Sequence, residues 1–126
     1  MSLQTPLAKV RGLGSAKQGV QHWWYQRLTA IVLVPLSAWI LFSLISITSM
    51  DYILVTQWMK APLNAVLLIL FILSLFYHAQ LGMQVVIEDY VESEWQKITS
   101  LILVKFLALV TCLASVLAIL KVFLGL

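Results

Sequence analysis

Three long runs of apolar residues constrain this chain more than any other feature. They cover residues 28–50, 63–87 and 98–120, and together hold 71 of the 126 residues. Each run is long enough to cross a hydrocarbon core of about 30 Å, which takes about 20 residues of helix. The strict alternation of a barrel strand is absent, and only helices or closed barrels satisfy the backbone in lipid. We therefore predict an all-α membrane protein with three transmembrane helices.

The composition excludes the water-soluble classes of protein. Hydrophobic residues make up 62% of the chain and charged residues 10%, against about 45–50% and about 25% in globular domains. A soluble fold of this size would expose large apolar patches. These values exclude a free soluble enzyme, a nucleic-acid-binding protein and a disordered tail. The single cysteine, Cys112, lies in an apolar run and excludes a disulfide framework.

The polar segments divide the chain. Residues 1–27 are predicted to form a tail in which Gly12, Gly14 and Gly19 interrupt regular structure, and residues 28–126 a three-helix anchor domain. Two short loops are predicted at 50–61 and 88–97, the first ending at a proline suited to the first turn of the next helix.

The distribution of basic residues predicts the orientation. The tail carries four of them, whereas the first loop carries only Lys60. Those four are Lys9, Arg11, Lys17 and Arg27. By the positive-inside rule the N-terminus lies in the cytoplasm and, after three spans, the C-terminus lies on the outer side of the membrane. Lys105, inside the third run, is expected to extend its side chain toward the cytoplasmic face.

His78 is an ionisable side chain inside the second run, and such a residue suggests a functional site. Ser74 precedes it by one helical turn and Gly82 follows by one turn, so the three form a stripe of small or polar residues. A haem beside an axial histidine needs small neighbours. The other interpretation is a neutral histidine that hydrogen-bonds to another helix at a close packing contact. His22, the other histidine, precedes the first run and cannot reach the same iron, so a bound haem would be shared with another chain or five-coordinate.

Three further residues flank the runs. Arg27, the last charge before the first run, could bind a buried anion such as a haem propionate, or could simply extend to the membrane surface. Asp89 and Tyr90 follow the second run. Together they offer the hydrogen-bond donor and the proton route that quinone reduction needs. The alternative is a tyrosine of the interfacial aromatic belt beside a solvated acid.

Two motifs resemble a known family. The segment His22–Ala30 is similar to the start of the first helix in the hydrophobic membrane anchors of bacterial succinate dehydrogenase. Gly12–Lys17 resembles the α-proteobacterial and mitochondrial-like branch of that family. His78–Met83 followed by Asp89–Val91 resembles its haem and quinone signature, with ten residues between the histidine and the aspartate.

The resemblance implies a role for each matching residue. His78 would be one axial ligand of haem b, with the other on a cytochrome b556-type partner anchor subunit, and Arg27 would approach a propionate. Tyr90 would hydrogen-bond a ubiquinone carbonyl, and Asp89 would support proton delivery. The three helices would then be part of a heteromeric bundle in the lipid of a bacterial inner membrane, with the C-terminus in the periplasm. The bundle would be bound to an iron–sulfur and a flavoprotein subunit. Succinate oxidation would take place on those other chains.

Two functions from different classes follow. The first is an electron-transfer subunit of succinate:ubiquinone oxidoreductase, which links the tricarboxylic acid cycle to the respiratory chain. The second is a structural or assembly membrane subunit without redox chemistry, in which His78 only joins two helices. An anchor of a fumarate reductase that uses menaquinone is a variant of the first.

Overall fold

The computed structural model describes residues 5–11 and 16–126, which form five α-helices and no strand. The helices are α1 (Pro6–Val10), α2 (Ala16–Ile47), α3 (Tyr52–Lys60), α4 (Pro62–Tyr90) and α5 (Glu94–Leu124). Three of these segments are long and apolar enough to cross a membrane: α2 from Gly19 onward, α4 and α5. The predicted all-helical membrane fold with three spans is therefore confirmed.

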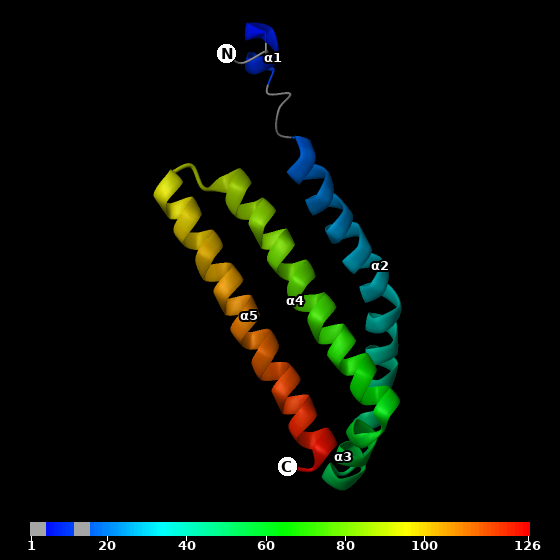
Figure 1. Cartoon of the computed structure of the whole chain (residues 1–126). Helices are drawn as coiled ribbons and strands as arrows, with labels where there is room; N and C mark the ends of the chain where they lie inside the picture. Colours follow the sequence, from blue (N-terminus) through cyan, green and yellow to red (C-terminus); the bar gives the residue numbers. More distant parts are fainter. Residues whose placement is uncertain (1–4, 12–15) are drawn as a thin grey trace.

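The three long helices run side by side, with α4 between α2 and α5 and packed against both (Figure 1). The start of α2 lies at the same end as the connection between α4 and α5, and α3 lies at the other end with the C-terminus (Figure 1). Only Val91–Ser93 separate α4 from α5. A connection this short makes α4 and α5 antiparallel neighbours.

Local chemistry explains where the helices begin and end. The Asp51 side chain accepts a hydrogen bond of 2.9 Å from the backbone N–H of Leu54, which caps the N-terminus of α3. Pro62 occupies the first turn of α4, as predicted. Gly125, at φ 74°, ends α5 in the left-handed region and donates its N–H to the last carbonyls of the helix.

The helices extend further than the apolar runs, so three expectations were wrong. Gly19 lies inside α2, because a glycine costs a helix only about 0.5–1 kcal/mol. The segment 50–61 contains α3 instead of being a loop throughout, and the second loop is only 91–93 instead of 88–97. Gly12 and Gly14 lie outside the described residues. The division into a tail and an anchor domain stays a prediction.

The end of the bundle that holds α3 is closed by packing. We call it the closed half: residues 36–47 of α2, all of α3, residues 62–70 of α4 and residues 115–124 of α5. Trp39 and Trp58 stack with ring centroids 5.7 Å apart. The Asn64 side chain donates a 2.9 Å hydrogen bond to the Trp58 carbonyl. Helix α3 also packs against α4 and α5, so it joins the ends of the long helices.

The opposite end has no such cover. We call it the open half: residues 19–29 of α2, 77–90 of α4 and 94–105 of α5. Few side chains in the described chain are buried, and only Leu81 and Ile87 of them lie in this half. A bundle with so little core needs lipid or other helices around it. So small a core is consistent with a subunit of a larger membrane assembly.

Candidate functional site

His78 lies in α4 and is held by two side chains of α2. Its Nδ1 lies 3.0 Å from Thr29 Oγ1, and its Nε2 lies 3.5 Å from Gln26 Nε2. Gln26 and Thr29 are three residues apart and therefore share one face of α2. The sequence analysis did not single out either residue.

Thr29 determines which nitrogen of His78 carries the ring proton. The Thr29 hydroxyl donates to the backbone carbonyls of Tyr25 and Gln26 at 2.8 and 3.0 Å, as a threonine in a helix commonly does. A hydroxyl has one proton, so toward His78 it accepts, and Nδ1 is the donor. The Gln26 amide nitrogen can only donate, which agrees with a lone pair on Nε2. The tautomer is thus assigned from the hydrogen-bond network.

The surroundings of His78 fit an axial haem ligand. A ligating histidine almost always donates its other N–H to an acceptor, and Thr29 is that acceptor here. The contact from Nε2 to Gln26 is at the outer limit of a hydrogen bond. Gln26 Oε1 is buried with no partner in the described part of the chain, so displacing this side chain costs little. Beside it, Gly82 leaves room: a Cβ there would lie 3.8 Å from Gln26 Nε2.

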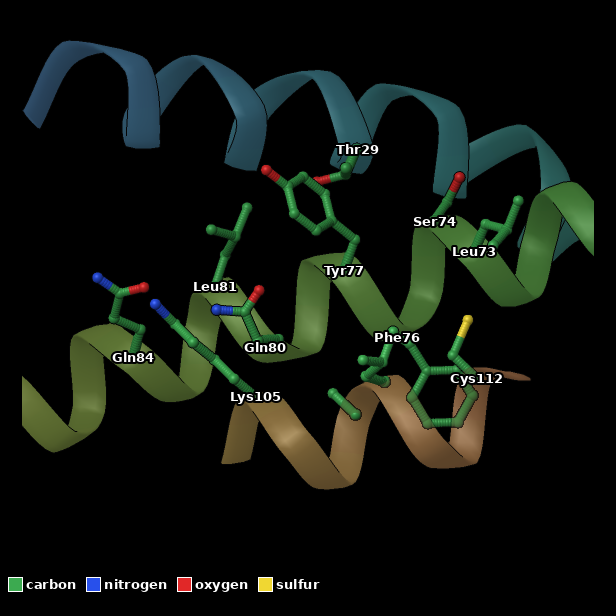
Figure 2. A pocket seen from close by; sticks show the side chains of 12 residues that line it. Thr29, Leu73, Ser74, Phe76, Tyr77, Gln80, Leu81, Gln84, Lys105 and Cys112 are labelled. Atoms are coloured by element: carbon green, nitrogen blue, oxygen red, sulfur yellow. The ribbon is translucent and has the colours of Figure 1, made fainter. Parts of the chain in front are cut away.

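The predicted stripe of Ser74, His78 and Gly82 lies on the side of α4 that faces α2, because residues four apart in a helix are only about 40° apart around it. Ser74 points toward α2 (Figure 2) and lines the same cavity as Thr29. Gly82 faces Gln26 of α2.

Arg27 does not approach His78 in this chain. Its guanidinium lies over the Trp23 ring, 5.4 Å from the centroid, and the side chain is exposed. Around α2, Arg27 is about 100° from Gln26 and about 160° from Thr29. A contact between Arg27 and a propionate stays a prediction, and would require the propionate to reach the outer side of α2.

Asp89 and Tyr90 end α4 and project into open space. Because α4 continues to Tyr90, Asp89 lies about 20° from His78 around the helix, as expected. Tyr90 is 81% exposed, and neither residue makes a hydrogen bond through its side chain to another described residue. Both lie roughly 16–18 Å from His78 along the helix axis. Their side chains are therefore available to another molecule.

The sequence analysis also missed a second polar region between α2 and α4. His22 Nε2 is buried without a partner in residues 5–11 and 16–126. Its side chain lines a small pocket of about 300 Å³ with Gln84 and Glu88, whose side chains are joined by a 2.8 Å hydrogen bond. The signal in the sequence was a helical period of polar residues. The spacings of four and three between His22, Gln26 and Thr29 place them on one face of α2.

The described residues contain no group of three or more histidine, cysteine, aspartate or glutamate side chains that could bind a metal ion. A haem shared by two subunits would need only one histidine ligand from each of them. His78 could supply the ligand from this chain.

Fold and site together define a class: a three-span, all-helical membrane subunit in which His78 of the second span contacts two polar side chains of the first. The model of the family "Succinate dehydrogenase/Fumarate reductase transmembrane subunit" matches residues 1–114. The chain belongs to this family.

Relatives of known name agree with this assignment. The "Succinate dehydrogenase hydrophobic membrane anchor subunit" of Rickettsia bellii is 38% identical over 113 residues, which cover 90% of each chain. The protein of the same name from Rickettsia conorii is 37% identical over 113 residues, covering 89% of this chain and 90% of that one. The "Succinate dehydrogenase membrane anchor subunit" of Reclinomonas americana is 36% identical over 96 residues, covering 74% and 80%. The resemblance predicted from the motifs is confirmed. No solved structure matches the chain at a significant level.

Proposed function

We propose that this chain is a membrane anchor subunit of succinate:ubiquinone oxidoreductase. It shares one haem b with a cytochrome b556-type partner anchor subunit and helps to form the site of ubiquinone reduction. In this way it links succinate oxidation in the tricarboxylic acid cycle to the respiratory chain. The family match and the names of the relatives support the enzyme complex.

One observation carries the haem assignment: His78 donates from Nδ1 to Thr29 and keeps the lone pair of Nε2 available. When bound, haem b supplies a one-electron carrier within the membrane. His78 would hold the haem iron through Nε2, with Thr29 fixing its tautomer and the small Gly82 beside it. The other ligand to the iron would come from the partner anchor subunit, because His22 lies further along α2, beyond Gln26.

Asp89 and Tyr90 are the chain's contribution to the quinone site. The Tyr90 hydroxyl donates a hydrogen bond to a quinone carbonyl, and the Asp89 carboxylate supports proton delivery from the aqueous side. Their exposure in the isolated chain supports this role, since the remaining quinone ligands must come from other subunits.

The remaining partners follow from the complex. An iron–sulfur and a flavoprotein subunit bind on the cytoplasmic side, where the basic tail of this inner-membrane protein also lies. Succinate is oxidised on those chains. A fumarate reductase anchor would use the same residues, and the direction of electron flow distinguishes the two enzymes.

The test is a reduced-minus-oxidised spectrum of the purified complex. We expect a b-type α-band in the wild type, and its loss or conversion to a high-spin form in His78→Ala. His22→Gln, a change in the only other histidine, should leave the low-spin band unchanged. A colourless wild-type complex, or an unchanged band in His78→Ala, would instead support a structural subunit without redox chemistry.

A further inference from the structure

Two buried polar atoms of α2, in its interface with α4, take no part in the function proposed above. They are Nε2 of His22 and Oε1 of Gln26. Among residues 5–11 and 16–126 they are the only buried side-chain nitrogen or oxygen atoms without a hydrogen-bond partner. A buried polar atom that stays unpaired costs more free energy than a typical hydrogen bond contributes. Two such atoms on one helix indicate that the side chains have a second arrangement.

The Gln26 amide cannot satisfy its oxygen in its present position. Its Nε2 lies 3.5 Å from His78 Nε2. Thr29 accepts from His78 Nδ1, so His78 Nε2 is an acceptor and the amide must turn an N–H toward it. Turning the amide over would place two acceptors against each other. The oxygen therefore stays unpaired as long as Gln26 contacts His78.

His22 carries the complementary group. Gln26 follows His22 by four residues, a spacing at which two side chains of a helix are neighbours. Side chains in a helix also lean toward its N-terminus, which is the direction from Gln26 to His22. A neutral histidine with its proton on Nε2 donates from that atom, whereas Gln26 Oε1 can only accept. The two unpaired atoms would therefore satisfy each other if the Gln26 amide left His78.

Iron binding at His78 would give the amide a reason to leave. The lone pair of His78 Nε2 can accept from the Gln26 N–H or bind a metal ion, but it cannot do both. Gln26 thus holds the ligand position of His78 in the described arrangement. Gly82 leaves space beside the amide, since even an added Cβ there would lie 3.8 Å from its nitrogen.

We propose that Gln26 is a positioning residue with two partners. Before haem binds, its amide donates to His78 Nε2 and keeps that nitrogen unprotonated. After haem binds, its oxygen accepts from His22 Nε2, which stabilises the haem-loaded arrangement. This inference rests on the haem assignment proposed above and gives a role to two residues that the assignment leaves without one.

The experiment measures how the purified complex and apomyoglobin share haem at equilibrium. His22→Leu removes the second partner of Gln26 and should weaken haem retention about two- to tenfold, the effect of one hydrogen bond. Gln26→Leu removes both contacts of the amide, so the two losses oppose each other and retention should change less. The decisive variant is the double one, because His22→Leu should have no further effect once residue 26 is leucine.

Three further variants complete the series. His22→Gln places an amide N–H close to the position of the histidine Nε2, so it should retain haem as the wild type does. His22→Asn keeps a polar side chain but shortens it, so it should weaken retention as His22→Leu does. Gln21→Leu makes the same change as Gln26→Leu at an exposed position of α2 and should change nothing. The α-band should stay low-spin throughout, because His78 remains the ligand.

Three results would overturn the proposal. Weaker retention caused by His22→Leu in both backgrounds would mean that His22 contacts the haem directly or only holds the helices in place. Wild-type retention in His22→Leu would mean that Gln26 does not use this partner. Both results would leave the haem assignment intact, whereas a wild-type complex without a b-type α-band would remove that assignment together with this inference.

Discussion

The two ends of this bundle are built from different chemistry. The closed half is held by a tryptophan stack, a capped short helix and a glycine that ends α5. The open half contains the polar side chains that face between helices, including His78 and its two partners from α2. Two polar atoms there, His22 Nε2 and Gln26 Oε1, are buried without a partner in the described residues.

This difference separates stability from function. Apolar and aromatic contacts can hold helices together without any other subunit, whereas polar groups inside a membrane cost free energy and are kept where they bind something. We therefore expect substitutions in the closed half to change assembly and leave redox properties intact. Substitutions in the open half should do the reverse.

The largest expected effect concerns which half faces the cytoplasm. A reporter fused after Leu126 should give a wholly periplasmic signal, because four basic residues in or beside the tail keep the N-terminus inside. The same reporter inserted in the 91–93 loop should read cytoplasmic. A cytoplasmic signal from both positions would mean that α5 does not cross the membrane.

The next effect should fall on quinone reduction. Tyr90→Phe removes only a hydroxyl, and a lost hydrogen bond of about 0.5–1.5 kcal/mol, or somewhat more to a charged oxygen, predicts a three- to thirtyfold decrease. Ubiquinone reductase activity measures it, while succinate oxidation by a soluble artificial acceptor should not change.

Tyr52→Phe provides a control for the other half, since Tyr52 on α3 is as exposed as Tyr90, at 82% against 81%. It should leave both activities at the wild-type level. A parallel decrease of both activities in Tyr90→Phe would indicate damaged assembly and would contradict a role in the quinone site.

A smaller effect is expected from the end of α5. Gly125→Ala places a side chain at φ 74°, which costs about 1–2 kcal/mol for an L-residue, although the new Cβ would meet Lys60 Nζ only at 3.6 Å. The temperature at which the complex dissociates should decrease while the haem spectrum stays constant. An altered haem spectrum in Gly125→Ala would break the separation between the two halves.

The smallest effect should come from Thr29. In Thr29→Val the Nδ1–H of His78 loses its acceptor, so the ligand becomes less basic and the haem potential should rise. A hydrogen bond of about 0.5–1.5 kcal/mol corresponds to a shift of about 20–65 mV for one electron. Redox titration of the α-band measures this shift, and Thr29→Ser should restore the wild-type value. Equal shifts in both variants would show that packing, not the hydroxyl, sets the potential.

The sequence predicted the features that depend on local chemistry. Apolar length identified three spans, Pro62 marked the start of α4, and helical periodicity placed Asp89 on the face of His78. The resemblance in two short motifs identified the family. Each of these signals is contained in a few adjacent residues.

The features that were missed depend on how the helices pack. Thr29 and Gln26 reach His78 only because α2 and α4 meet at one register, and nothing in either segment alone fixes that register. Helix α3 was missed because nine residues are too few for a clear apolar period. The predicted second loop, 88–97, was longer than the observed loop, 91–93. Both helices continue into polar sequence, where water can satisfy the free backbone groups at their ends.

Helix α2 is longer than a membrane crossing requires, and its part between Ala16 and the contact with His78 at Thr29 precedes the internal Pro35. The 32 residues of the helix span roughly 48 Å, whereas the hydrocarbon core is about 30 Å thick, so roughly 18 Å of helix is not needed for crossing. Whatever attaches before Ala16 is thus set at a fixed height and a fixed angle relative to His78. Inserting one residue near Gly19 would move that attachment by about 1.5 Å along the helix axis and turn it by about 100° around the axis. The insertion would therefore change the direction in which the attachment faces far more than its height.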